Sequence, residues 1–211
     1  MLAEGKVGVG LGADGILGPA RLGRTGELIV GTAHGDFYEA VARQSVFTIS
    51  NAVAGVAPGT ALSTTPPIAL WNPPGSGVNL ALVKAVMSYV SGTLGAGSVV
   101  FGLVAQQSTQ PTGGTQLTAQ SNLIGSTKTP LGKGFTGSTL ATTPTILRPF
   151  ASFGPYLATS VLQERTCETV NDGAIVVAPG GVLCMQGVAT AGTSPLVIFG
   201  IVFEEVPIIG S

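Results

Sequence analysis

The sequence offers few side chains that could perform chemistry, and their types limit what that chemistry could be. His34 is the single histidine, and Cys167 and Cys184 are the two cysteines. A cysteine nucleophile would need His34 as its base, and a zinc site would need carboxylates to complete a set of one histidine and two cysteines. No serine stands in a G-x-S-x-G motif, which marks the nucleophile of many hydrolases. The sequence therefore predicts no enzymatic activity and no metal site.

Two neighbouring carboxylates, Glu204 and Glu205, are the only pair that resembles the acid and base of a glycosidase. Both end an apolar run that is expected to be a strand, and neighbours on a strand point to opposite faces. The two groups should therefore not share a proton. We expect solvated charges at a strand end, or ionic partners of Arg148 or Arg165 in another subunit.

Two glycine motifs look like nucleotide-binding loops, but neither has the required context. Residues 10–15 match G-x-G-x-x-G, which binds dinucleotides only between a strand and a helix. Gly18-Pro19 prevents a helix at this point. Gly132-Lys133-Gly134 lacks both the Ser or Thr after Lys and the earlier Gly of a phosphate loop. No cofactor is predicted.

The remaining candidates are aromatic side chains and thiols. Trp71 and Tyr156 could each offer a flat ring for stacking on a sugar, although a single Trp at a strand end more often packs at the edge of a core. Cys167 and Cys184 are too few for a disulfide framework and form no C-x-x-C motif. We expect two buried free thiols, and a single bridge between them stays open.

The composition describes a chain with an uncharged surface. Charged residues make up 9% of the sequence and hydrophobic residues 45%, with a net charge of −1, whereas a soluble domain usually carries about 25% charged residues. The nine basic residues are scattered from Lys6 to Arg165, so no basic stripe is available for nucleic acid. The surface must be either unusually uncharged or largely covered by partners.

Neither a membrane span nor a secretion signal is expected. Residues 85–106 are apolar and long enough to cross a membrane, but residues 91–98 are small, polar and turn-forming, which favours a hairpin. The first residues lack a basic region followed by an apolar one, so the protein is expected to be made in a cytosol.

The chain is predicted to be all-β, with a jelly-roll-like antiparallel β-sandwich over residues 44–211. Residues 1–43 read as an extended glycine-rich arm with one or two helical turns between Asp36 and Arg43. The long polar segment from about 108 to 144 is predicted to be a surface loop, or a ribbon without a core of its own. Short β-branched and aromatic runs between turn-forming clusters predict eight strands: 45–50, 68–72, 80–90, 98–106, 156–164, 174–178, 182–189 and 196–206.

Several of these strands are apolar on both faces, which a free antiparallel sandwich does not require. The simplest cover for the second face is another copy of the chain. The arm could also lie against an adjacent subunit, because its glycines allow close backbone approach. The residues predicted to form interfaces are Val7, Val9, Leu11, Leu80, Leu82, Val86, Met87, Tyr89, Val99, Phe101 and Leu103.

Two stretches resemble virion structural proteins of tailed bacteriophages. The first is Leu70-Trp71-Asn72-Pro73-Pro74-Gly75-Ser76-Gly77-Val78-Asn79-Leu80, continuing to Tyr89-Val90-Ser91-Gly92-Thr93-Leu94-Gly95-Ala96-Gly97, and the second runs from Pro179-Gly180-Gly181-Val182 to Phe203-Glu204-Glu205-Val206-Pro207. The resemblance implies a cement or decoration protein that binds the major capsid protein on the outside of an icosahedral capsid. It also implies a homo-oligomer, most often a trimer, synthesised in the host cytoplasm, with no catalytic residue. The alternative is a head-fibre or tail receptor-binding module that contacts host surface glycans through Trp71 or Tyr156.

Overall fold

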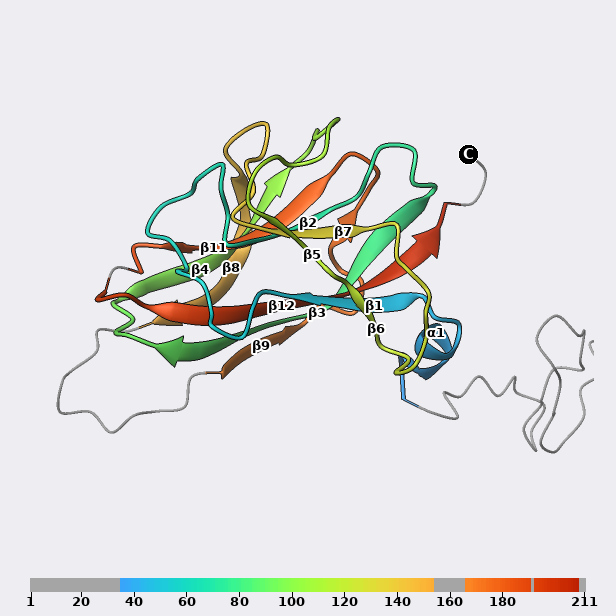
Figure 1. The fold of residues 1–211 in the computed structure, drawn as a ribbon, viewed down its shortest axis with the longest axis horizontal. Coiled ribbons are helices and arrows are strands. Elements are labelled where there is room, and N and C mark those ends of the chain that lie inside the picture. The colour runs from blue at the N-terminus through green and yellow to red at the C-terminus, as the bar shows by residue number, and fades with distance from the viewer. Residues whose placement is uncertain (1–34, 154–165, 191, 209–211) are drawn as a thin grey trace, which may run out of the picture. The chain divides into compact units, whose positions relative to one another are not determined.

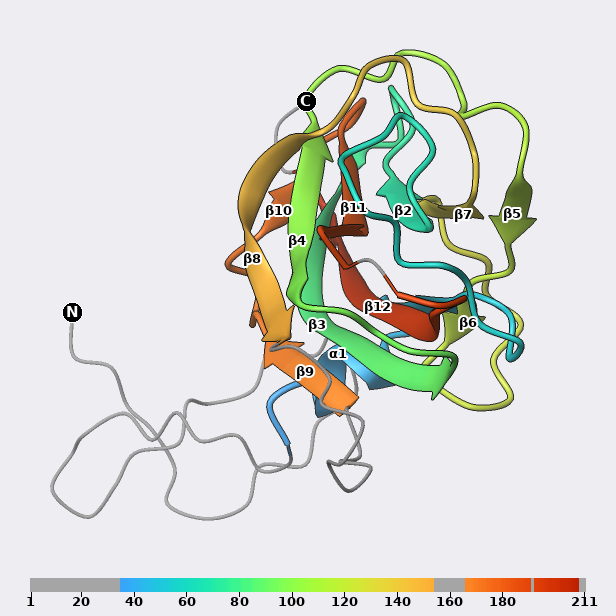
Figure 2. The same ribbon diagram turned by 90° about the vertical axis from the view of Figure 1, so that its left-hand side faces the viewer.

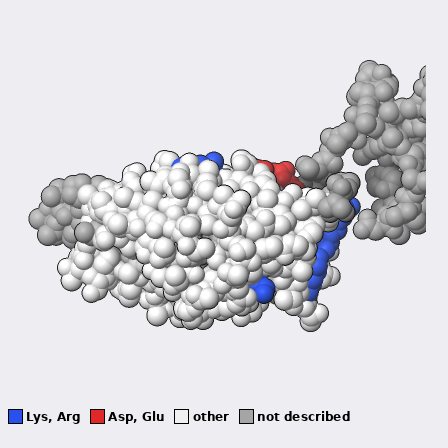
Figure 3. Space-filling view, turned by 90° about the horizontal axis from the view of Figure 1, so that it is seen from above, with Lys and Arg blue, Asp and Glu red and all other residues white. Residues whose placement is uncertain are grey.

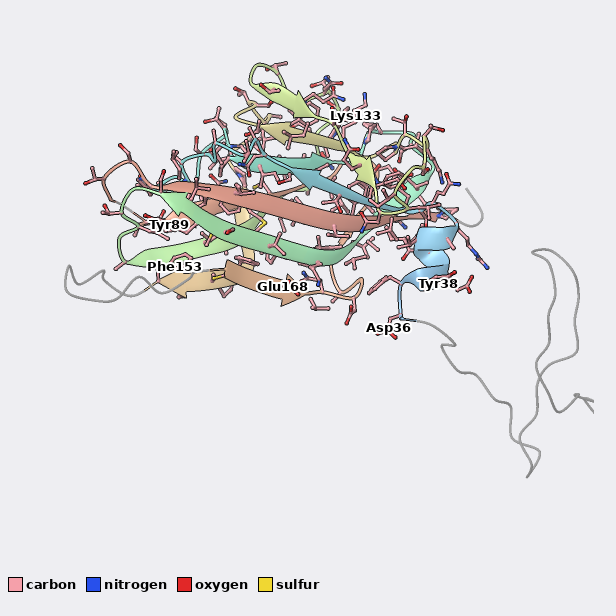
Figure 4. All side chains as sticks on the ribbon, turned by 60° about the horizontal axis from the view of Figure 1, so that its bottom comes forward. Asp36, Tyr38, Tyr89, Lys133, Phe153 and Glu168 are labelled. Carbon is pink, nitrogen blue, oxygen red and sulfur yellow. The ribbon has the colours of Figure 1, made fainter. Side chains whose placement is uncertain are left out.

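The chain divides into two compact units, Met1–Glu39 and Ala40–Ser211. The computed structural model describes residues 35–153, 166–190 and 192–208. The expected glycine-rich arm therefore lies almost wholly outside the described residues. The short helix α1 (Tyr38–Ala42) confirms the helical turns expected between Asp36 and Arg43, and Figure 4 labels Asp36 and Tyr38 at this helix.

The second unit is an antiparallel β-sandwich, as predicted, with two six-stranded sheets in two layers (Figures 1 and 2). The first sheet has the order β10–β3–β12–β1–β6, and β9 also pairs with β3. The second sheet has the order β5–β7–β2–β11–β4–β8. The strands of the first sheet are β1 (Val46–Ser50), β3 (Val78–Ser91), β6 (Gln120–Ser121), β9 (Thr166–Val170), β10 (Val176–Val177) and β12 (Leu196–Pro207). Those of the second are β2 (Ile68–Trp71), β4 (Gly97–Val104), β5 (Thr115–Leu117), β7 (Lys133–Thr136), β8 (Thr145–Phe153) and β11 (Val182–Val188).

The core lies between the two sheets, and β12 shows how the sequence builds it. Alternate residues of β12 point inward and are fully buried, while the residues between them lie on the outer face. The ring of Phe203 on β12 packs against the ring of Phe47 on β1, with centroids 5.9 Å apart. Each large apolar side chain buried in this way contributes about 1.5–3 kcal/mol to folding. The inward residues of β12 are Val197, Phe199, Ile201 and Phe203.

The stretch expected to form a hairpin, residues 85–106, does form two strands with a turn between them. However, β3 belongs to the first sheet and β4 to the second, so the two strands do not pair. The hairpin prediction is wrong in this respect, because the turn carries the chain across the sandwich instead of folding it back within one sheet.

The segment expected to be a surface loop, residues 108–144, is part of both sheets. Its strand β6 pairs with β1 in the first sheet, and its strand β7 pairs with β2 in the second. The chain between β6 and β7 therefore closes one edge of the sandwich. The polar composition of this segment did not indicate its strands, because short strands near a sheet edge need few apolar side chains.

A second, smaller apolar cluster covers the outer face of the second sheet. Leu140, from the segment after β7, packs there against residues of β2, β4, β7 and β11. The chain itself therefore covers part of this outer face, including Val104 at the end of β4. The cluster consists of Ala69, Trp71, Val104, Phe135, Leu140, Val182 and Cys184.

The opposite edge of the sandwich, called the open edge below, is formed by β8 of one sheet and by β9 and β10 of the other. Figure 2 shows these three strands along the same side of the molecule. Two of them, β8 and β9, were not among the predicted strands, and the predicted strand 156–164 lies outside the described residues. Pro149 sits within β8, at an edge position where a missing N–H is tolerated.

Candidate functional site

Five residues predicted to form a subunit interface lie in the core instead. Their side chains are fully buried because they occupy the inward faces of β3 and β4. The interface prediction is therefore wrong for these positions. They are Leu80, Leu82, Met87, Val99 and Phe101.

The other residues predicted to form an interface lie in several different parts of the chain. Val86 lies half-buried on the outer face of β3, Leu103 lines a groove described below, and the Tyr89 hydroxyl donates to the carbonyl of Gly92 at the turn after β3. Figure 4 labels Tyr89 at this end of the strand. Three positions of the arm lie outside the described residues: Val7, Val9 and Leu11.

Trp71 is not available for stacking on a sugar. Its ring is 5% exposed and packs against Phe135, with centroids 6.3 Å apart. Its Nε1 donates to the carbonyl of Gln107 at 3.0 Å, and the Lys133 ammonium lies 5.8 Å from the ring centre. Through this hydrogen bond, Trp71 holds the loop after β4 against the second sheet. The other residue predicted to stack on a glycan, Tyr156, lies outside the described residues.

Cys167 and Cys184 are not joined in a disulfide and lie in different parts of the sandwich. Cys167 on β9 packs against the main core, whereas Cys184 on β11 lies in the outer cluster of the second sheet. Burial raises the pKa of the Cys184 thiol from 9.0 to about 12, so this thiol stays protonated and unreactive at neutral pH. The open alternative of a Cys167–Cys184 bridge is therefore wrong. The expected burial is confirmed for Cys184, whereas Cys167 is only partly buried.

Glu204 and Glu205 point to opposite faces, as expected, but Glu205 is not solvated. Its side chain is 7% exposed, and its Oε1 accepts the backbone N–H of Leu131 at 2.6 Å and of Gly132 at 2.9 Å. Among the described residues, the one side-chain hydrogen bond of Glu204 is a long one of 3.4 Å, accepted from the Ser45 hydroxyl. The buried carboxylate holds the chain that closes one edge of the sandwich, which is a structural role.

Metal and membrane chemistry find no support in the described part of the chain. Its His, Cys, Asp and Glu side chains form no group of three that could hold a metal ion. No helix among the described residues has the length and hydropathy of a membrane span. His34 and the glycine motif at 10–15 lie outside those residues.

Among the described residues, the candidate binding feature is a groove of about 450 Å³ at the open edge, between β10 and the ends of β4, β8 and β11. Its walls are aliphatic, and Leu147 on β8 and Val176 on β10 are 42% and 54% exposed. Arg148 is the one charged residue that lines it. Its guanidinium carbon lies 5.5 Å from the centre of the buried Phe101 ring.

The polar turn between β2 and β3 fixes one end of this groove. The Asn72 side chain is fully buried and donates to the carbonyls of Val78 and Val177, both at 2.8 Å. The backbone of Asn72 also exchanges hydrogen bonds with Gly180 and Gly181. These contacts position β10 and the loop before β11, so the groove is built into the fold.

Sequence reasoning assigned Arg148 only as a partner of a carboxylate, and it assigned Leu147 and Val176 no role. Large aliphatic residues are common in any β-protein, so their exposure could not be read from type and spacing. The sequence feature that could have indicated an apolar groove with one cation is the run Ile146-Leu147-Arg148, in which an arginine follows two aliphatic residues.

Comparison with known proteins gives no match: no protein-family model, curated protein or solved structure is similar to this chain.

Proposed function

We propose that this chain is a structural protein of a tailed-bacteriophage virion, a cement or decoration protein that binds and stabilises the exterior of an icosahedral capsid. One observation carries the proposal: a sandwich that has already filled its own core still exposes large aliphatic side chains on a surface with few charges. Figure 3 shows one face on which Lys, Arg, Asp and Glu are sparse. The exposed residues at or near the open edge are Ile146, Leu147, Val170 and Val176.

Such a surface suits assembly, because apolar burial between subunits is the main source of binding free energy in large, permanent interfaces. The sequence resemblance to phage virion proteins around Asn72–Gly77 and Glu204–Pro207 supports the same class. We further propose that the partners are the major capsid protein and two more copies of this chain.

The strand order supports a more specific fold within the sandwich. β1, β12, β3 and β9 lie side by side in one sheet, and β2, β11, β4 and β8 in the other. Successive strands alternate between the layers at the start of the chain. We propose that these eight strands form a jelly roll, an architecture found in viral capsid domains.

The test uses heads of the phage that encodes this chain, assembled without it. Purified chain is mixed with these heads, and co-sedimentation in a density gradient measures binding. We expect saturable binding at a fixed number of copies per head and a higher temperature of head disruption. No co-sedimentation at saturating protein would contradict the proposal, and a monomer by light scattering of the free chain would contradict the pre-formed trimer.

A further inference from the structure

The groove at the open edge combines apolar walls with a single cation, Arg148, for which the described residues supply no neutralising carboxylate. Among residues 35–153, 166–190 and 192–208, no acidic side chain forms an ion pair with Arg148. The one ion pair of the described chain joins Lys84 and Glu168, at 2.8 Å, on β3 and β9; Figure 4 labels Glu168. The guanidinium is charged at any physiological pH. The groove therefore complements a ligand that is mostly aliphatic and carries one carboxylate.

The position of Arg148 makes this complementarity specific. Arg148 stands directly opposite Phe101 in the β8–β4 pairing, and its half-buried guanidinium lies over that ring. Phe150 packs edge-on against the same ring at 5.5 Å. The stacking restricts the side chain, so less entropy is lost when its N–H groups meet a carboxylate.

The surroundings of the groove fit a segment of protein chain better than a small molecule. Exposed Ile146 and Val170 extend the apolar surface beyond the groove, along the same edge. The strands on either side, β8 and β10, are both edge strands, and an edge strand presents backbone N–H and C=O groups to an incoming chain. A volume of about 450 Å³ holds a few aliphatic side chains.

We propose that this groove binds an extended segment of a partner protein in which Asp or Glu is flanked by aliphatic residues. The carboxylate meets Arg148, and the flanking side chains lie between Leu147 and Val176. This inference goes beyond the proposed function, because it concerns the groove whatever assembly the chain belongs to. It can fail while capsid binding holds, and it can hold while capsid binding fails.

The first experiment measures amide NMR shifts of the full, ¹⁵N-labelled chain during titration with blocked pentapeptides. The probes are acetyl-Thr-Val-Glu-Val-Thr-amide and its Gln and Lys counterparts, each up to about 5 mM, which detects dissociation constants in the millimolar range. We expect shifts at residues 146–148 and 174–178, and an affinity order of Glu above Gln above Lys. Glu should exceed Gln by about three- to tenfold, because the pair with Arg148 is charge-assisted but partly exposed.

Two variants and a matched control locate the binding. Arg148→Gln should lower the affinity for the Glu peptide to that for the Gln peptide, and Val176→Glu should abolish shifts with the Glu peptide. Lys128→Gln is the control, because the Lys128 ammonium also lies near an aromatic ring, 5.9 Å from the centre of Phe47, but away from the groove. It should leave all affinities unchanged, and thermal melting should show that all three variants are folded.

Three outcomes would overturn the proposal. One is equal affinity for the Glu and Gln peptides, or no shifts at all at the highest concentration. Another is binding of decanoate in the groove while the peptides do not bind, which would assign the site to small aliphatic carboxylates. The third is self-association of the free chain that Arg148→Gln abolishes, which would make a second copy the occupant.

Discussion

The buried carboxylate of Glu205 should contribute strongly to the stability of the sandwich. Its Oε1 accepts two backbone N–H groups, of which that of Gly132 is buried and that of Leu131 belongs to an exposed residue. A hydrogen bond to a charged group contributes about 1.5–3 kcal/mol, and an orphaned buried donor costs about 1–3 kcal/mol. We therefore expect Glu205→Leu to lower the free energy of unfolding by about 3–4 kcal/mol.

Glu205→Gln keeps an acceptor oxygen but loses the charge, so we expect a smaller loss of about 1–2 kcal/mol. For a domain of this size, 1 kcal/mol shifts the melting temperature by about 2–4 °C, so a loss of about 3–4 kcal/mol should make the Leu variant melt about 6–16 °C lower. The assay is urea unfolding followed by the fluorescence of Trp71, the single, buried tryptophan. Thermal melting gives the second measure.

The neighbouring glutamate supplies a matched control. Glu204 has the same side chain on the same strand but points outward, and within the described part of the chain it accepts just the long hydrogen bond from Ser45. Glu204→Leu should therefore cost less than about 1 kcal/mol. Equal losses for the two Leu variants, or a Glu205→Leu variant within 1 kcal/mol of the parent, would refute the assignment of Glu205 as an anchor.

Two further predictions follow from local geometry. Gly113 and Gly114 both have positive φ, but an added Cβ at Gly113 meets nothing within 4 Å, whereas at Gly114 it would strike the carbonyl oxygen of Thr136 and the carbonyl carbon of Gly137 at 2.5 Å. Gly113→Ala should therefore cost about 1–2 kcal/mol and Gly114→Ala clearly more in urea unfolding, and equal costs would contradict this. The pKa of the Cys184 thiol is raised from 9.0 to about 12 in the folded chain. The stabilisation that the protonated thiol gives the folded state is therefore complete below pH 9. As the pH rises from 9 towards 12, the free energy of unfolding should fall by up to about 1.4 kcal/mol per pH unit. Unfolding measured between pH 8 and about 11 should show this slope in the parent and not in Cys184→Val, and identical slopes would contradict it.

The sequence predicted the sandwich well because its strongest strands alternate clearly or are β-branched. The run over residues 196–206 became β12 almost to the residue. The amino-acid sequence could not show which face of β3 would be buried, since both faces are apolar. It also could not show the register shift between Val202 and Phe203 where β12 pairs with β3. The cover on the second sheet depends on Leu140 joining the same apolar cluster as Trp71, and these two residues lie far apart in the chain.

The candidate site was harder to predict than the fold. β8 was missed because Arg148 and Pro149 interrupt an otherwise apolar run, and each is unusual in a strand. Both residues make sense once β8 is known to be an edge strand. The burial of Glu205 was missed for a related reason, since its partners Leu131 and Gly132 lie over 70 positions earlier, and only the tertiary fold brings them together.

The pairing of the first strand, β1, with the last strand, β12, has a mechanical consequence. β1 and β12 are antiparallel neighbours, with Val46 opposite Glu204 and Ser50 opposite Gly200, so the start of β1 and the end of β12 lie at the same end of the sheet. A force that pulls these two points apart would load the hydrogen bonds of the ladder one after another, as in a zipper, and not all together in shear. The sandwich should therefore resist tension weakly when it is held at these two points.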